Sequence, residues 1–300
     1  MLKTTINGIE FKNPVIAASG TFGFGSEYSE FYDVGMLGGI SSKGLTLNPR
    51  QGNEGLRVFE TESGMMNSVG LQNPGVDLFM KEELPQMIQL GTNVIANVGG
   101  GTIEEYEEAI KKLDKSEIHM IELNISCPNV KSGGMAFGIK SKDAYGIVSR
   151  IRKLTKKPLM VKLSPNAEDI VDMAYKCCEA GADSLSLINT AKGLAIDINK
   201  RKPVFNNTFA GLSGPCIKPI ALRMVYEVSK AVDVPIIGLG GIMNGKDAVE
   251  FLMAGASAIQ IGTVNFINPY AGKEIIEEME AILKGQGVKN IKEIIGVVRR

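Results

Sequence analysis

Eight short apolar runs, separated by longer amphipathic stretches, constrain the fold more than any other feature of this sequence. The runs are rich in Val, Ile, Leu and Ala, and they cover residues 15–19, 39–43, 93–98, 120–125, 159–163, 184–188, 235–239 and 258–262. Stretches with a helical period lie between several of them, at residues 102–115, 142–154, 167–180, 219–231, 245–254 and 270–284. This alternation predicts an α/β protein with a (β/α)8 barrel of the TIM type. An open doubly wound sheet is the alternative, because periodicity cannot show closure.

The start of the chain carries a separate signal. The segment TTINGIEFK contains Asn7-Gly8, the residue pair that favours a two-residue hairpin turn. We expect an N-terminal β-hairpin that closes the bottom of the barrel. No linker-like or low-complexity segment interrupts the alternation, so we expect one domain over residues 1–300, which is near the upper size for a single core.

Composition excludes several classes of function. Lys and Arg number 33 and Asp and Glu also 33, so no basic field favours nucleic acid or anionic lipid. The opening residues lack the apolar region of a signal peptide, and no stretch approaches the roughly 18 apolar residues of a membrane span. Four cysteines without a C-x-x-C pair are typical of a reduced, cytoplasmic protein. His119 is the only histidine, so we expect neither a histidine-based triad nor a metal site.

Strand alternation separates the residues that face the helices from those that face the barrel lumen. In the run 159–163 the aliphatic odd positions face the helices, which leaves Lys162 inside; in the run 120–125, Glu122 and Asn124 are inside. Polar groups in a lumen are costly unless they are paired or bind a ligand. Active sites of such barrels lie at the C-terminal ends of the strands. Lys162 therefore has two compatible interpretations, an ion pair with Glu122 and contact with a ligand.

Glycines end the last two predicted strands. Gly238, Gly240 and Gly241 close the seventh and Gly262-Thr263 closes the eighth, where barrels of this kind bind phosphate through backbone N–H groups. Tight turns that need positive φ are the alternative, but two such loops at the two expected strands favour a phosphate-bearing ligand. No G-x-G-x-x-G follows the first run, which disfavours a Rossmann dinucleotide site.

Carboxamides and one thiol gather at the same predicted strand ends. Carboxamides both donate and accept hydrogen bonds, so they suit cyclic amides and flavin edges, and they occur here at Asn67, Asn97, Asn124, Asn129 and Asn189. Cys127 follows the strand that carries Asn124 and is the candidate reactive thiol. The other three cysteines, Cys177, Cys178 and Cys216, are expected to be inert.

These motifs resemble the class 1 dihydroorotate dehydrogenases, the FMN enzymes of de novo pyrimidine biosynthesis. The matching segments fall in the family's order from Ser19 to Thr263: SSKG, MMNSVGLQNPG, ELNISCPN, VKLSP, INT, GLSGPCIKP, GLGGI and QIGT. The stretch ETESGMMNSVGLQNPG is most similar to the NAD-linked class 1B branch, rather than the fumarate-using class 1A branch.

The resemblance implies a reaction and its residues. Cys127 would remove the C5 proton of dihydroorotate while a hydride passes from C6 to N5 of FMN, one FMN per chain, giving orotate. The implied substrate-binding residues are Lys43, Asn67, Ser68, Val69, Gly70, Leu71, Asn124, Asn189 and Thr190. The implied FMN-binding residues are Ser19, Lys43, Gly44, Asn97, Asn124, Lys162, Ile188, Gly214, Gly240, Gly241, Gly262 and Thr263. The loop at residues 131–137 matches the family poorly, so no role is assigned to it or to Asn129.

The class 1B resemblance also implies a partner. A separate subunit with FAD and a [2Fe-2S] cluster would pass electrons to NAD, and two such subunits would join a homodimer of this chain in a heterotetramer. The four cysteines here are not clustered as an iron–sulfur centre requires. Three alternatives stay open: a fumarate-dependent class 1A-like homodimer, a non-redox phosphate-binding lyase or isomerase barrel, and a non-enzymatic scaffold.

Overall fold

A closed ring of eight parallel strands forms the centre of the computed structural model, which describes residues 1–125 and 137–299. The predicted (β/α)8 barrel is therefore confirmed, and the open-sheet alternative is wrong. β16 pairs with β3, which closes the ring, with Ile259 opposite Val15 and Ile261 opposite Ala17. The barrel strands in chain order are β3 (Val15–Ala17), β4 (Gly39–Ser41), β7 (Asn93–Val98), β8 (Met120–Asn124), β9 (Leu159–Lys162), β10 (Ser184–Leu187), β15 (Ile236–Leu239) and β16 (Ala258–Ile261).

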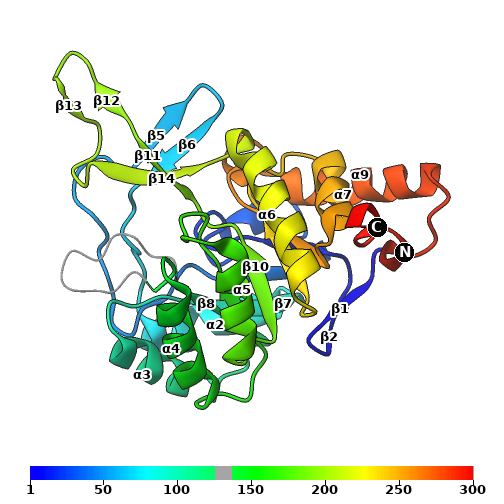
Figure 1. Cartoon of the computed structure of the whole chain (residues 1–300), viewed down its shortest axis with the longest axis horizontal. Helices are drawn as coiled ribbons and strands as arrows, with labels where there is room; N and C mark the ends of the chain where they lie inside the picture. The colour runs from blue at the N-terminus through cyan, green and yellow to red at the C-terminus, as the bar shows by residue number, and fades with distance from the viewer. Residues whose placement is uncertain (126–136, 300) are drawn as a thin grey trace.

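Helices cover the outside of the barrel (Figure 1). The apolar side chains at alternate strand positions, such as Ile121, Leu123 and Val161, are fully buried against them. Six helices match the predicted stretches: α3 (Ile103–Leu113), α4 (Ser141–Arg152), α5 (Ile170–Glu179), α6 (Lys218–Ala231), α7 (Gly245–Ala254) and α9 (Ala271–Gly285). The sequence analysis missed α1 (Val76–Leu78), η3 (Phe79–Glu83), α2 (Leu84–Gln89) and α8 (Val264–Ile267).

Side-chain caps set where several helices begin. Thr102 accepts a hydrogen bond from the N–H of Glu105 at the start of α3, as its residue type predicts. The stretch predicted to begin at residue 167 instead becomes helical at Ile170, because Asp169 caps α5 by accepting from the N–H groups of Val171 and Asp172. Short 3-10 turns complete the described elements: η1 (Glu27–Glu30), η2 (Val34–Met36), η4 (Pro215–Ile217), η5 (Ile291–Glu293) and η6 (Val297–Arg299).

The predicted N-terminal hairpin is present and closes the bottom of the barrel. β1 (Thr4–Ile6) pairs with β2 (Ile9–Phe11) through a turn in which Asn7 and Gly8 have φ values of 51° and 80°. Ile6 and Phe11 are buried in a cluster with lumen residues of the barrel strands: Ile16, Ile95, Met120, Met160, Ile237 and Ala258. The Asn7 side chain donates to Oγ of Ser184 at 2.8 Å. The N-terminal end of the lumen is thus filled by apolar side chains.

A second, antiparallel sheet covers the other end of the barrel, and the sequence analysis did not predict it. It consists of β5 (Val58–Thr61), β6 (Gly64–Asn67), β11 (Ala191–Leu194) and β14 (Phe209–Ser213), in the order β11-β14-β6-β5, and is called the roof sheet below. A small hairpin of β12 (Ile196–Asp197) and β13 (Lys202–Pro203) extends from it (Figure 1). The roof sheet is built from two excursions of the chain, one after β4 and one after β10.

Within residues 1–125 and 137–299, no helix has both the length and the apolar character needed to cross a bilayer.

Truncating Phe11 tests the role of the hairpin as the floor of the barrel. We expect Phe11→Ala to lower the free energy of unfolding by about 3–5 kcal/mol, because the buried ring leaves a cavity beneath the lumen. Urea denaturation measures this loss. Glu10→Ala, an exposed position on the same strand, is the control and is expected to change stability by no more than about 0.5 kcal/mol. Equal effects of the two variants would show that the hairpin is not part of the core.

Candidate active site

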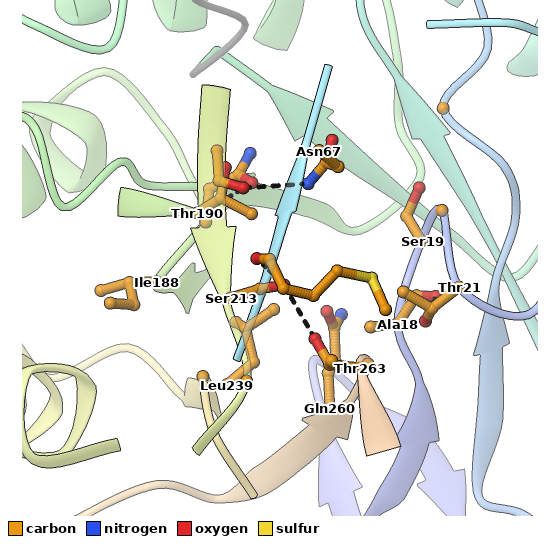
Figure 2. Close-up of a pocket in the computed structure, with 18 of the residues that line it drawn as sticks. Ala18, Ser19, Thr21, Asn67, Ile188, Thr190, Ser213, Leu239, Gln260 and Thr263 are labelled. Carbon is orange, nitrogen blue, oxygen red and sulfur yellow. Dashed lines mark hydrogen bonds between the residues drawn. The ribbon is translucent and has the colours of Figure 1, made fainter. Parts of the chain in front are cut away.

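A cavity lies between the C-terminal ends of the barrel strands and the roof sheet (Figure 2). Asn67 and Ser213 enter it from the roof sheet, and Gln260 and Thr263 from the end of β16. Eighteen sequence-predicted residues line this cavity: Ser19, Lys43, Gly44, Asn67, Val69, Gly70, Leu71, Asn97, Asn124, Lys162, Ile188, Asn189, Thr190, Gly214, Gly240, Gly241, Gly262 and Thr263. The cavity therefore brings together residues that are up to 244 positions apart (263 − 19).

One predicted site residue lies elsewhere. Ser68 is buried and does not line the cavity; its Oγ accepts hydrogen bonds from the side-chain amides of Asn53 and Asn207. These bonds tie the residue after β6 to its neighbouring loops. Cys127, Asn129 and residues 131–136 lie outside the described residues.

The glycines at the ends of β15 and in the β14–η4 turn need both backbone freedom and close packing. Gly240 and Gly241 have φ values of 124° and 78°, and Gly214 has 96°. A Cβ on Gly241 would lie 2.8 Å from the carbonyl oxygen of Gly214. The positive φ values show that these glycines are needed for tight turns, as the alternative interpretation predicted. Because the same glycines line the cavity and have no side chain, their backbone peptide groups are not covered by a side chain of their own.

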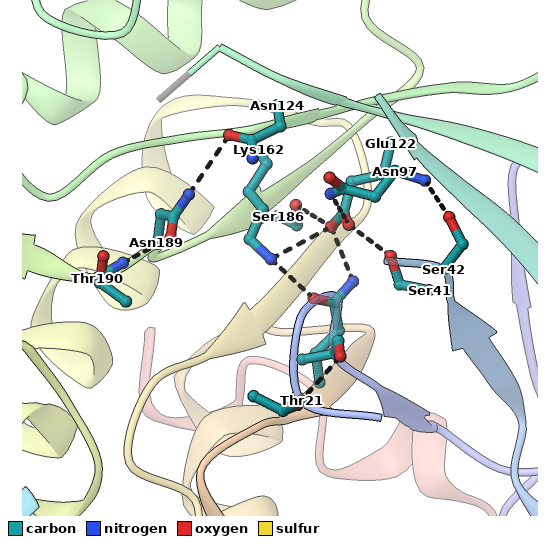
Figure 3. Close-up of polar contacts among 12 residues, drawn as sticks. Thr21, Ser41, Ser42, Asn97, Glu122, Asn124, Lys162, Ser186, Asn189 and Thr190 are labelled. Atoms are coloured by element: carbon teal, nitrogen blue, oxygen red, sulfur yellow. Dashed lines mark hydrogen bonds and ion pairs between the residues drawn. The ribbon is translucent and has the colours of Figure 1, made fainter. Parts of the chain in front are cut away.

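A buried carboxylate lies beneath the cavity (Figure 3). Glu122 is fully buried, and its side chain lies in the lumen as the strand alternation predicts. Four hydrogen bonds reach its two oxygens, and Nζ of Lys162 is 4.0 Å from Oε1. The donors are Ser41 at 2.7 Å, Asn97 at 2.6 Å, Ser186 at 2.8 Å and Gln260 at 2.8 Å.

These contacts decide the charge of Glu122. Burial by itself would raise the pKa of the carboxyl, but the Lys162 ammonium and the hydrogen bonds outweigh burial and lower the pKa below its usual range. Glu122 is therefore ionised, and the predicted ion pair with Lys162 is present. Lys162 also lines the cavity, so both interpretations of this lysine hold together.

Asn97 presents a polar atom that the described residues leave unsatisfied. Its Nδ2 donates to Glu122, whereas its Oδ1 is buried and has no hydrogen-bond partner among the described residues. Because Asn97 lines the cavity, a ligand with an N–H group could satisfy this oxygen. The flavin ring edge carries such an N–H between two carbonyls, so the donor and acceptor set around Asn97 and Lys162 fits an isoalloxazine. The bare glycine peptides at the ends of β15 and β16 fit a phosphate tail.

Two polar contacts connect the walls of the cavity. Oγ1 of Thr263 donates to Oγ of Ser213 at 2.9 Å, which joins the end of β16 to the roof sheet (Figure 2). Nδ2 of Asn189 donates to Oδ1 of Asn124 at 3.4 Å, which joins the ends of β10 and β8 (Figure 3). The first contact thus links the barrel rim to the roof sheet, and the second links two strand ends within the rim.

The sequence analysis missed several residues of the cavity wall. Gln260 is the clearest, because the alternation that places Ile259 and Ile261 toward the helices also places Gln260 in the lumen. The same argument that found Lys162 could have found it. Ser213 and Met65 had no such signal, because they come from the roof sheet.

No cysteine within the described residues lines the cavity. Burial raises the pKa of the Cys177 thiol, and it raises that of Cys178 to about 11. Cys216 is exposed and does not line the cavity. His119 is structural, since its Nδ1 accepts the N–H of Val94 at 3.0 Å.

Comparison with known proteins identifies the family. The model of the family described as dihydroorotate dehydrogenase matches residues 1–283. The chain belongs to the dihydroorotate dehydrogenase family. A relative from Petrotoga mobilis, named "Dihydroorotate dehydrogenase B (NAD(+)), catalytic subunit", is 61% identical over 296 residues, which cover 99% of each chain.

Two further relatives carry the same name. The protein of Geotalea uraniireducens is 51% identical and covers 99% of this chain and 98% of its own. That of Alkaliphilus metalliredigens is 52% identical and covers 98% of both. The predicted similarity to the NAD-linked class 1B branch is confirmed, and so is the expectation of an oxidoreductase. The scaffold and non-redox barrel alternatives are not supported.

Burial of the Lys43 ammonium predicts how the stability of the ligand-free protein changes with pH. Burial lowers the pKa of this ammonium, so the folded state disfavours the charged form. The resulting destabilisation is complete below the folded-state pKa and disappears as the pH rises toward the unfolded value of about 10.4. Lys43→Met should therefore raise the melting temperature at pH 7, and the difference in melting temperature from the unchanged protein should narrow at alkaline pH.

Differential scanning calorimetry of ligand-free protein between pH 7 and pH 10 measures the Lys43 effect. Lys192→Met, an exposed cation on the roof sheet, is the control and should leave the pH profile unchanged. If the difference in melting temperature between Lys43→Met and the unchanged protein did not vary with pH, burial of the Lys43 ammonium would have no electrostatic cost.

Proposed function

We propose that this chain oxidises dihydroorotate to orotate in de novo pyrimidine biosynthesis, with one FMN held in the cavity. The observation that carries the proposal is that a single cavity collects eighteen of the nineteen residues predicted for FMN and for the substrate. The family match over residues 1–283 supports the same reaction. When bound, FMN supplies an acceptor for the hydride that leaves C6 of the substrate.

The residues of the chain would hold FMN at both ends. Gly240, Gly241, Gly262 and Thr263 would bind the phosphate through backbone N–H groups. At the other end, Oδ1 of Asn97 would accept from a ring N–H. The Lys162 ammonium would oppose negative charge at the ring, in a site where burial strengthens electrostatic interactions.

The substrate would lie between FMN and the roof sheet. The carboxamides of Asn67, Asn124 and Asn189 line this part of the cavity and match the amide edges of a cyclic ureide. Lys43, the second cation that lines the cavity among the described residues, would bind the carboxylate of dihydroorotate. A carboxylate would also favour the charged form of this lysine and offset the cost of its burial.

Cys127 would remove the proton from C5. It follows Ile125, the last described residue after β8, by two positions, and β8 carries Asn124 to the cavity. An ordinary thiol has a pKa near 8.5, so only a few per cent is thiolate at neutral pH. A cysteine base therefore acts faster as the pH rises, until the thiol is fully ionised.

A separate subunit would carry electrons onward to NAD. The relatives are named as NAD(+)-type catalytic subunits, which supports a partner for this chain as well. We propose that the partner holds FAD and a [2Fe-2S] cluster and that two partners join a homodimer of this chain. The four cysteines, at positions 127, 177, 178 and 216, lack the spacing of a cluster site, and no G-x-G-x-x-G follows the first barrel strand.

An anaerobic visible spectrum tests cofactor, substrate and base together. The purified chain should show flavin absorption that bleaches on addition of dihydroorotate. Cys127→Ala should keep its flavin but bleach about 100-fold to 10,000-fold more slowly, because a positioned general base is lost. Cys127→Ser should recover part of the rate only at high pH, and Cys216→Ala is the control with an unchanged rate. A colourless protein would refute the proposal, and fast bleaching of Cys127→Ala would refute the role of Cys127.

The acceptor is tested by steady-state assays of the chain alone. We expect slow reduction of NAD and of fumarate, with fast reduction of a small artificial dye as the control that the first half-reaction is intact. Addition of the FAD and iron–sulfur subunit should restore NAD reduction, and size-exclusion chromatography with light scattering should give two copies of each subunit. Efficient turnover of the isolated chain with fumarate would instead place it with the class 1A enzymes.

A further inference from the structure

The Glu122 carboxylate beneath the cavity is saturated by neutral donors. An ionised carboxyl group offers about four lone-pair positions to donors. Here two neutral groups reach each oxygen at ordinary hydrogen-bond distance, from Ser41 and Asn97 on Oε2 and from Ser186 and Gln260 on Oε1. Glu122 can therefore stay ionised in a fully buried position without a direct hydrogen bond from its cationic neighbour.

The carboxylate of Glu122 balances the charge of Lys162, but the ammonium makes no short hydrogen bond to Glu122 or Gln260. The side chain of Lys162 is 5% exposed, and its Nζ lies 4.0 Å from Oε1 of Glu122 and 3.5 Å from Oε1 of Gln260. Charge-assisted hydrogen bonds are about 2.7–2.9 Å long, so neither contact is a strong one. An ammonium has three protons to donate. Because Lys162 lines the cavity, these protons are available to a ligand there.

The same carboxylate also orients Asn97. Its Oε2 accepts from Nδ2 of Asn97 at 2.6 Å, which turns the carboxamide so that Oδ1 is the atom left without a partner among the described residues. A carboxylate cannot donate, so the reversed orientation of the carboxamide would place two acceptors against each other. Glu122 therefore influences two of the polar groups that line the cavity, Lys162 and Asn97.

We propose that Glu122 is a positioning residue: because four neutral donors saturate its oxygens, it balances the charge of Lys162 while leaving the protons of that lysine to the ligand of the cavity. Glu122 does not touch that ligand, and it acts through Lys162 and Asn97. The identity of the ligand as FMN rests on the proposed function, whereas the coupling of Glu122 with Lys162 does not. Lys43 is the other charged residue of the described cavity wall, but among the described residues Glu122 forms an ion pair only with Lys162.

Two serines on one strand allow a matched test. Ser186 and Ser184 are both fully buried in β10 and both face the lumen, but Ser186 donates to Glu122 whereas Ser184 accepts from Asn7 at the floor. Neither lines the cavity. In Ser186→Ala, Lys162 can take the vacated position on Oε1 and withdraw from the ligand. We expect its FMN dissociation constant to rise about threefold to tenfold, whereas Ser184→Ala should leave it unchanged.

Recovery of flavin fluorescence on dilution of the holoenzyme measures both dissociation constants, and melting temperatures of the FMN-free forms report any general loss of stability. A rise confined to Ser186→Ala supports the proposal. Equal dissociation constants for the two variants would overturn it, even if the unchanged protein binds FMN and bleaches with dihydroorotate. In that case the proposed function would stand and only the role of Glu122 would fail.

A double-mutant cycle tests the charge balance without FMN. Glu122→Gln and Lys162→Met each leave one buried charge uncompensated, so each should lower the melting temperature of the FMN-free protein. The double variant buries neither charge and should lose less than the sum of the two single losses. Additive losses would overturn the proposal. If Glu122→Gln alone does not fold, folding of the double variant likewise supports the charge balance between Glu122 and Lys162. If neither variant folds, the FMN dissociation constants of Ser186→Ala and Ser184→Ala test the proposal.

Discussion

The ionised carboxylate of Glu122, buried in the lumen of a barrel, is the constraint around which the upper half of this structure is arranged. An isolated charge at such a position would be very costly, so its neighbours must supply hydrogen bonds and an opposite charge. They come from five different strands: Ser41 on β4, Asn97 on β7, Lys162 on β9, Ser186 on β10 and Gln260 on β16. A closed barrel is the arrangement that brings these five strands around one point.

The lumen is therefore layered along the barrel axis. Apolar side chains and the hairpin residues Ile6 and Phe11 fill the N-terminal end, and the Glu122 network occupies the middle. The cavity lies above that network and below the roof sheet. The positions of Lys162 and Asn97 at the base of the cavity therefore depend on the hydrogen bonds of Glu122, a residue that does not line the cavity.

Much of this arrangement could be predicted from the sequence, and the physical reason differs from part to part. The barrel and the lumen positions of Lys162, Glu122 and Asn124 follow from strand alternation, which is a local property. The roof sheet was missed because its central pair joins Met66 to Leu212, far apart in the sequence, so the pairing is not a local property. Ser68 was assigned by resemblance to a motif, but its hydroxyl is bound to Asn53 and Asn207, which only the tertiary structure reveals.

The pairing of β6 with β14 has a consequence for how the protein is made. Asn67 reaches Gly211 across 144 residues, and Gly214 packs directly against Gly64. During translation, the chain thus cannot complete the roof sheet until β14 has been synthesised. Before that point Met66 on β6 lacks Phe205 and Ala210, the residues that bury it in the folded protein. Until then, the edge of β6 that pairs with β14 has no strand beside it.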